Sequence, residues 1–195
     1  MERVNEGAES IMYETKIAGV PMLIKFRNKK LWRIDKIDEE LRERRTKKEA
    51  KLLIYAKKAG AAVPGVAAIG KYSIFMQKVG GKLLKDSKPS AHDMQTIGRY
   101  LALLHANGIT HGDFTSANIL LTKNGPFIID FGLGVFSNSE EEKALDLLLL
   151  ERSISKKDYA NVRKAYTSIA KDHLTVTKRL NEIKKRGRYQ TRTLA

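Results

Sequence analysis

A histidine, an aspartate and an asparagine stand close together near the middle of the chain, in the run 111–118 (HGDFTSAN). The spacing H-x-D-x-x-x-x-N is typical of enzymes that transfer a phosphoryl group from ATP. In such a loop the aspartate accepts the proton of the attacking hydroxyl group, and the asparagine binds a metal ion. The sequence therefore predicts Asp113 as the catalytic base and Asn118 as a ligand of Mg²⁺.

A second aspartate follows in the motif Asp130-Phe131-Gly132, directly after the apolar run 127–129. An aspartate at the end of a buried strand has a fixed position and can hold Mg²⁺ against ATP phosphates. The alternative is a buried aspartate that caps a turn, with an unrelated asparagine in a loop. Because both motifs occur together and in order, we interpret Asp130 as the second metal ligand.

A lysine and a glutamate nearer the N-terminus can anchor the phosphates. Lys25 lies inside the apolar stretch 21–26, where a charge needs an anionic partner or a route to water. Glu49 shares a helical face with Leu53, four residues later, so its carboxylate could orient Lys25 towards ATP. The alternatives are an edge-strand charge for Lys25 and a capping box with Thr46 for Glu49. We favour the ion pair.

The N-terminal segment 5–10 (NEGAES) matches the glycine-rich pattern of a phosphate lid only in part. It holds one glycine, whereas protein kinases carry G-x-G-x-x-G. Its place near the first strands predicts that Gly7, Ala8 and Glu9 contact the nucleotide. Glu9 should repel phosphate unless its carboxylate points at a metal ion or a basic side chain.

The elements that must position these residues are strand-rich at first. Strands with β-branched and aromatic residues are predicted at 10–16, 20–27, 66–69 and 72–77. A charged helix with an apolar face is predicted over 38–58, before the breakers at 60–65. Gly80-Gly81 then forms a flexible joint between two lobes.

Helices dominate after that joint. Ser90 and Asp93 have the spacing of a capping box, which opens a helix that Gly108 ends. Short strands are predicted at 119–122 and 127–130, and helices over 139–185. The pattern predicts an α+β, bilobal, minimal protein-kinase-like fold, with an N-lobe at 1–79, a helical lobe at 80–185 and a basic tail at 186–195.

Regulated kinases have features that this chain lacks. Gly112 stands where they carry an arginine that grips a phosphorylated loop, and only residues 133–138 separate the metal motif from the next helix. Thr115 replaces a lysine that is common in Ser/Thr kinases. We infer a minimal kinase that suits ATP hydrolysis better than general protein substrates. Asp146, an acid among leucines, is expected to hold the backbone of the catalytic loop.

The composition is that of a globular protein, with 42% apolar and 30% charged residues, but the net charge is +15. Such an excess favours contact with a polyanion, and the alternative is a generally basic, heat-adapted surface. There are no cysteines, which excludes disulfides and thiol nucleophiles and fits the cytoplasm. No apolar run approaches the roughly 18 residues of a membrane span, so no membrane is expected as a partner.

Several segments resemble the small atypical kinase/ATPase of the KEOPS complex, the assembly that makes threonylcarbamoyladenosine in tRNA. This kinase/ATPase family is similar to the RIO kinases. The segments that carry the likeness are 7–9 (GAE), 44–50 (RRTKKEA), 111–113 (HGD), 129–133 (IDFGL) and 186–188 (RGR). The resemblance implies an ATP- and Mg²⁺-dependent atypical Ser/Thr kinase and ATPase that supports this tRNA modification. It also implies KEOPS subunits as partners, chiefly the tRNA threonylcarbamoyltransferase, together with tRNA.

The basic end of the chain has two interpretations. Lys184, Lys185, Arg186 and Arg188 could contact tRNA phosphates, or they could belong to a solvated helix end where cations suit the macrodipole. Two other functions also stay open. One is a RIO-type kinase of ribosome assembly, which shares the missing activation segment. The other is a non-catalytic RNA-binding scaffold that keeps a kinase shape.

Overall fold

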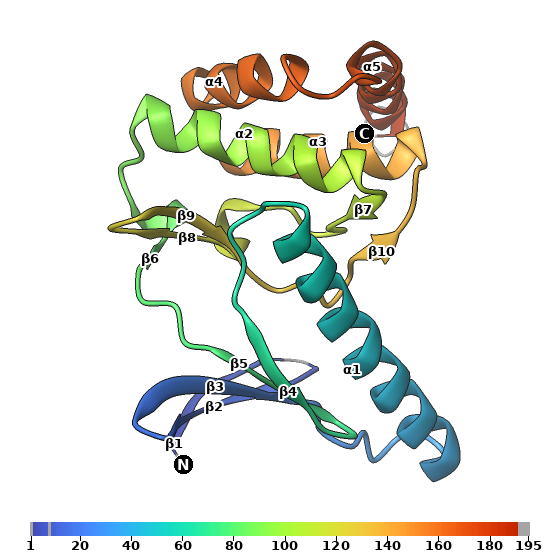
Figure 1. Ribbon diagram of the computed structural model, residues 1–195. Helices are drawn as coiled ribbons and strands as arrows, with labels where there is room; N and C mark the ends of the chain where they lie inside the picture. Colours follow the sequence, from blue (N-terminus) through green and yellow to red (C-terminus); the bar gives the residue numbers. More distant parts are fainter. Residues whose placement is uncertain (1, 8, 191–195) are drawn as a thin grey trace.

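Strands gather in the first part of the chain and helices in the last, as Figure 1 shows for the computed structural model. The structure describes residues 2–7 and 9–190, and at 5, 6 and 187–190 it describes the backbone alone. The predicted bilobal α+β fold is confirmed. None of the helices in the described ranges is long and apolar enough to cross a membrane.

The first lobe is built on a five-stranded antiparallel sheet in the order β1-β2-β3-β5-β4. The strands are β1 (Glu2–Glu6), β2 (Ile11–Ile17), β3 (Val20–Phe26), β4 (Val66–Ile69) and β5 (Ser73–Gln77). The last four lie where the sequence predicts strands. β1 adds a short, polar edge strand, a composition that discourages pairing with a further chain.

Helix α1 (Asp35–Lys58) connects β3 to β4 and packs against β4 and β5. It begins three residues before the predicted start at 38. Asp35 and Asp38 lie in its first turn, where the helix macrodipole favours acids, and Asp38 forms an ion pair with Arg42. The buried face of α1 includes Leu53 and Ala56, as the apolar spacing predicts.

The second lobe is mainly helical. Its elements are β6 (Lys82–Leu83), η1 (Leu84–Asp86), α2 (Ala91–Ala106), β7 (Ile109–Thr110), η2 (Ser116–Asn118), β8 (Ile119–Thr122), β9 (Gly125–Ile128), β10 (Val135–Phe136), α3 (Glu140–Ser153), α4 (Lys156–Thr167) and α5 (His173–Gln190). α2 packs on α4, and α3 packs on α5 (Figure 1). The predicted capping box opens α2, because Ser90 and Asp93 satisfy each other's backbone N–H groups.

Two predicted boundaries are wrong. Strand β9 ends at Ile128 rather than 130, because Asp130 has φ +61°, which an extended strand does not allow, and the N–H of Ile129 donates to the carbonyl of Asn118. The last helix, predicted to end at about 185, continues as α5 through Gln190. Residues 191–195 lie outside the described residues.

Candidate active site

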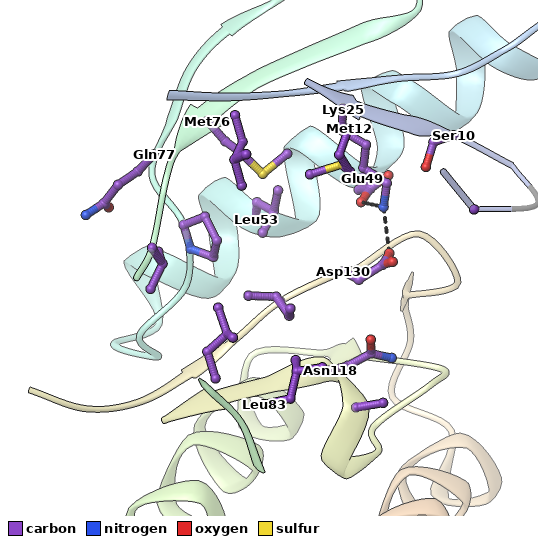
Figure 2. Close-up of a pocket in the computed structure, with 17 residues that line it drawn as sticks. Ser10, Met12, Lys25, Glu49, Leu53, Met76, Gln77, Leu83, Asn118 and Asp130 are labelled. Atoms are coloured by element: carbon purple, nitrogen blue, oxygen red, sulfur yellow. Dashed lines mark hydrogen bonds and ion pairs between the residues drawn. The ribbon is translucent and has the colours of Figure 1, made fainter. Parts of the chain in front are cut away.

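A cleft of about 300 Å³ lies between the two lobes. Apolar side chains from both lobes line most of it, including Met12, Leu23, Met76, Leu83 and Leu120. Lys25 and Glu49 reach it from the first lobe, and Asn118 and Asp130 from the second (Figure 2). An apolar cleft with a few convergent polar groups is the usual form of a small-molecule site.

Lys25 lies at the centre of the polar groups. Its Nζ donates to Oε1 of Glu49 at 2.6 Å and to Oδ1 of Asp130 at 2.7 Å. Lys25 is 8% exposed and Glu49 is 1% exposed. Burial opposes the charge of the lysine, but the two carboxylates outweigh it and raise its pKa. The structure therefore brings together the predicted ion pair and the predicted metal ligand.

The same lysine acts on Asp130. Burial would raise the pKa of this carboxyl group, but the charge and hydrogen bond of Lys25 outweigh burial and lower the pKa. Asp130 is consequently ionised at neutral pH, as a metal ligand must be. Its positive φ of 61° turns the chain sharply at the end of the strand pair and aims the carboxylate into the cleft.

The capping-box interpretation of Glu49 is wrong. Thr46 lies in the middle of α1, where N–H groups already have helical partners, and its hydroxyl donates to the carbonyl of Arg42 at 2.8 Å. The carboxylate of Glu49 instead faces two cations, because Arg27 donates to its Oε2 at 2.6 Å. Sequence reasoning missed Arg27. The signal was available, since residues two apart on a strand share a face and Lys25 was already assigned.

An acidic residue of the lid, Glu9, connects the lid to helix α1. Gly7 and Ser10 line the cleft, while Ala8 lies outside the described residues. Oε2 of Glu9 accepts a hydrogen bond from Arg45 and a longer one, at 3.4 Å, from Arg27. The bond from Arg45 is the main cause that lowers the pKa of Glu9. Glu9 thus points at basic side chains, the condition under which a phosphate could approach the lid.

We expect Arg45→Ala to raise the KM for ATP about tenfold, because the freed carboxylate of Glu9 would then repel the phosphates at the cleft. Steady-state ATP hydrolysis measures this, with kcat changing less than KM. Adding Glu9→Gln to the same variant should restore the KM, since it removes the repelling charge. A KM that stays high in the double variant would contradict this account of the lid.

The pH dependence of the lid contact has a definite sign. The pKa of Glu9 is lowered in the folded chain, so its contact with Arg45 is complete above the ordinary value of 4.5. The contact is lost as the pH falls through the lowered value. In Arg45→Ala the main cause of the lowering is gone, so the pKa of Glu9 moves back towards its ordinary value, and the KM effect should disappear as the pH falls through that range.

The predicted catalytic loop is held in a defined shape. Nδ2 of Asn118 donates to Oδ2 of Asp113 at 2.8 Å and to the carbonyl of Asp113 at 2.9 Å. The buried ring of His111 lies between the two motifs: Nε2 is 3.0 Å from the carbonyl of Ile129, and the N–H of Asp113 donates to Nδ1 at 3.3 Å. One neutral tautomer, with the proton on Nε2, satisfies both bonds. His111 therefore couples Asp113 to the strand end that carries Asp130.

Asp146 holds the loop backbone, as predicted. Its carboxylate accepts from the N–H of His111 at 2.7 Å and of Gly112 at 2.8 Å, and it also lies 3.2 Å from Nε2 of His105. Gly112 has φ +76°, and a Cβ atom there would lie 2.6 Å from the carbonyl oxygen of Leu133. A larger residue at 112 would require the two backbones to separate.

The predicted RNA contacts at the end of the chain lie away from the cleft. Lys184 forms an ion pair with Glu151, and Arg186 forms one with Glu141. Lys185 is exposed on α5. The side chain of Arg188 lies outside the described residues.

The donor set around the cleft fits Mg²⁺. Among the described residues, no cluster of three or more histidines or carboxylates could enclose a metal ion. Asn118 and Asp130 offer only two protein oxygen groups. Mg²⁺ keeps several waters and binds substrate phosphates in such sites, so two protein ligands suffice. Together with Lys25 as a phosphate anchor and Asp113 near the metal ligands, this arrangement can bind a metal–nucleotide complex and direct an attacking hydroxyl group.

Comparison with known proteins gives three kinds of match. Residues 24–181 match the RIO domain. A "Probable bifunctional tRNA threonylcarbamoyladenosine biosynthesis protein" of Methanosphaera stadtmanae is 37% identical, over 94% of this chain and 36% of that protein. The "KEOPS complex subunit Bud32" of Pyrococcus abyssi is 30% identical, over 99% of this chain and 98% of that one. The chain thus spans little more than a third of the bifunctional relatives and nearly the whole Bud32 relative.

Solved structures with the same fold are more distant in sequence. A Rio2 kinase–ADP/Mg²⁺–phosphoaspartate complex from Chaetomium thermophilum superposes with a TM-score of 0.63 at 19% identity, covering 96% of this chain and 70% of that one. WaaP in complex with acyl carrier protein gives a TM-score of 0.62 at 13% identity, covering 95% and 88%. These likenesses show the fold.

Proposed function

The chain belongs to the RIO domain family, and from this membership we propose that it is an ATP- and Mg²⁺-dependent kinase and ATPase that supports threonylcarbamoyladenosine modification of tRNA within a KEOPS complex. The predicted resemblance is confirmed by the family match and by relatives at 30–37% identity. The proposed enzyme class is supported by an Archaeoglobus fulgidus relative, 34% identical over 90% of its length, which is named a probable serine/threonine-protein kinase.

One observation carries the proposal. Nζ of Lys25 lies within 2.7 Å of carboxylates from both lobes, Glu49 from α1 and Asp130 from the metal motif. A buried lysine held between these two groups at an apolar cleft is the arrangement that protein kinases use to grip ATP phosphates. A scaffold has no need of this set together with Asp113 and Asn118.

Each residue then has a role in the proposed reaction. Lys25 would bind the α- and β-phosphates, and Glu49 would orient it. Asn118 and Asp130 would hold Mg²⁺, which neutralises charge on the phosphates. Asp113 would orient the attacking hydroxyl group or water and accept its proton. Gly7 and Glu9, with Ala8 outside the described residues, would form the lid.

The surroundings of the site favour hydrolysis or a restricted acceptor over general protein substrates. The segment after the metal motif pairs β10 with β7 and enters α3 at Glu140, so it forms no extended platform for a peptide. The bifunctional relatives are nearly three times as long as their match to this chain. From the relatives that are named as KEOPS subunits we propose that the chief partner is the threonylcarbamoyltransferase, and that tRNA contacts both proteins in the cytoplasm.

Mixing the chain with the threonylcarbamoyltransferase subunit and tRNA tests this proposal. We expect Mg²⁺-dependent release of phosphate from ATP to rise when partner and tRNA are present, and modified tRNA to accumulate. Asp113→Asn, which keeps the shape of the side chain and removes the base, should lower both by a factor of about 100 or more. Asp93→Asn, at the cap of α2, is the matched control.

Two outcomes would favour other functions. The RIO domain match also suits a kinase of ribosome assembly, and co-sedimentation with ribosomal particles in place of the tRNA-modifying partner would favour it. RNA binding without any ATP binding would favour the scaffold. If the mixture of this chain, the threonylcarbamoyltransferase and tRNA hydrolysed ATP but produced no modified tRNA, the KEOPS assignment would be overturned. The assignment as an ATPase would remain.

A further inference from the structure

One face of α1 carries a row of cations that is interrupted by a tyrosine. Arg44, Lys48, Lys51, Tyr55 and Lys58 follow one another at alternating steps of four and three residues, which places them on one face of the helix. We call this row the α1 stripe. Its five positions span fourteen residue steps, or about 21 Å along the axis at 1.5 Å per residue. The opposite face of α1 carries Glu49 and the core residues, so the stripe faces away from the core.

An aromatic pair lies within the stripe. Tyr55 is 46% exposed and Phe136, from the neighbouring β10, is 43% exposed. Their rings meet edge to face with centroids 5.5 Å apart. Nζ of Lys51 lies 5.7 Å from the centre of the Tyr55 ring and 5.4 Å from that of Phe136, and Nζ of Lys58 lies 5.5 Å from Tyr55. Two half-exposed rings are thus flanked by ammonium groups (Figure 1 shows β10 beside α1).

The stripe cations have no acidic partners among the described side chains. Within residues 2–7 and 9–190, no described carboxylate lies within ion-pair distance of Arg44, Lys48, Lys51 or Lys58. The helix dipole accounts for a cation at Lys58, in the last turn, but its effect does not extend to Arg44 or Lys48. The stripe therefore presents positive charges that no carboxylate of the described residues neutralises.

Three cations of α5 behave differently from those of the stripe. Arg179 pairs with Glu141 and Glu182, Lys184 pairs with Glu151, and Arg186 pairs with Glu141. An external phosphate would have to displace these carboxylates. Among the described side chains, the α1 stripe thus offers cations without a carboxylate partner, whereas these three cations of α5 are already paired.

We propose that the α1 stripe binds single-stranded RNA, with the cations on the phosphates and one base stacked at Tyr55 and Phe136. Proteins that bind single strands combine a positive track with aromatic platforms, and unpaired bases expose the faces that stack. An acidic protein partner would use the cations but would not need the exposed aromatic pair. This inference deepens the proposed function, because it names a surface for the unpaired part of the tRNA.

Fluorescence anisotropy with a labelled, unstructured RNA oligonucleotide at several salt concentrations tests the stripe on the full chain. Tyr55→Ala with Phe136→Ala should weaken binding by about 5- to 100-fold and leave the salt slope unchanged, since stacking releases no counterions. Lys48→Gln with Lys51→Gln should weaken binding and make the slope shallower by about 0.7 for each phosphate that the protein no longer neutralises. A base-paired form of the same oligonucleotide should lose less affinity on removal of the rings.

Two matched controls come from the same lobe. Lys57→Gln removes a charge from the same helix, but Lys57 lies on the opposite face, near Gly65. Trp32→Ala removes an aromatic side chain that is 77% exposed and has the guanidinium of Arg33 4.5 Å from its ring centre. Both controls should change RNA binding less than threefold. Equal losses in controls and stripe variants would overturn the inference, and so would stripe variants that bind RNA normally.

ATP hydrolysis separates this inference from the proposed function. The stripe variants should hydrolyse ATP at the wild-type rate, because none of these side chains lines the cleft. Wild-type protein that binds RNA through the stripe but never hydrolyses ATP would support the stripe and overturn the proposed function. Active ATP hydrolysis, together with RNA binding that the stripe variants leave unchanged, would support the proposed function and overturn the stripe.

Discussion

Replacing Asp130 with asparagine should lower Mg²⁺-dependent ATP hydrolysis by about a thousandfold or more, since a metal ligand acts most strongly in the transition state. Asparagine keeps the shape of the side chain and removes its charge. It also tolerates the left-handed φ of 61°, which alanine would adopt only with strain. Release of labelled phosphate from ATP measures the effect.

Asp86→Asn is the matched control for this variant. It makes the same chemical change at an exposed residue of η1, outside the cleft, and should hydrolyse ATP at the wild-type rate. Because Lys25 keeps its bond to Glu49 when Asp130 is changed, the variant should unfold at a similar urea concentration to the wild type. Normal hydrolysis by Asp130→Asn would mean that the metal is held elsewhere.

Replacing Glu49 with leucine should lower the free energy of unfolding by about 3–5 kcal/mol, the usual cost of removing one partner of a buried ion pair. Glu49 is almost fully buried and serves two buried cations. In its absence Lys25 keeps Asp130, but Arg27 keeps only the longer contact with Glu9. Urea unfolding, followed by circular dichroism, measures the change.

A compensating variant shows whether the loss of stability in Glu49→Leu comes from the broken ion pair or from altered packing of the core. Changing Lys25, Arg27 and Glu49 together to Met, Leu and Leu removes all three charges and should recover most of the stability, although it abolishes activity. Glu43→Leu, at a half-buried position of the same helix where the carboxylate pairs only with the exposed Lys47, should change stability little. If the triple variant were as unstable as Glu49→Leu, packing rather than charge would explain the loss.

Motifs and periodicity predicted most of this site from sequence. The positions of Lys25, Glu49, Asp113, Asn118 and Asp130 follow from residue type, spacing and the strand or helix that each occupies. The capping box of α2 followed from Ser90 and Asp93 alone, because both partners lie within one turn. Local interactions of this kind can be predicted because they depend on only a few consecutive residues.

The features that sequence reasoning missed depend on segments that meet only in the fold. Arg27 becomes part of the site because its guanidinium, just after β3, contacts both Glu49 of α1 and Glu9 of the lid. His111 bridges two motifs through the carbonyl of Ile129, a contact that no side-chain pattern indicates. The ion pairs between α3 and α5, such as Glu141 with Arg186, neutralise part of a charge cluster that looks free in the sequence.

The close approach of Gly112 to Leu133 limits how this protein could evolve. Control by loop phosphorylation needs an arginine beside the catalytic aspartate of a kinase, and Gly112 precedes Asp113, the aspartate proposed for that role here. Any side chain there would meet the carbonyl of Leu133 and would have to adopt a φ that only glycine accepts readily. No single substitution can therefore install this control. A lineage with this backbone could acquire the switch only after the loop itself had shifted.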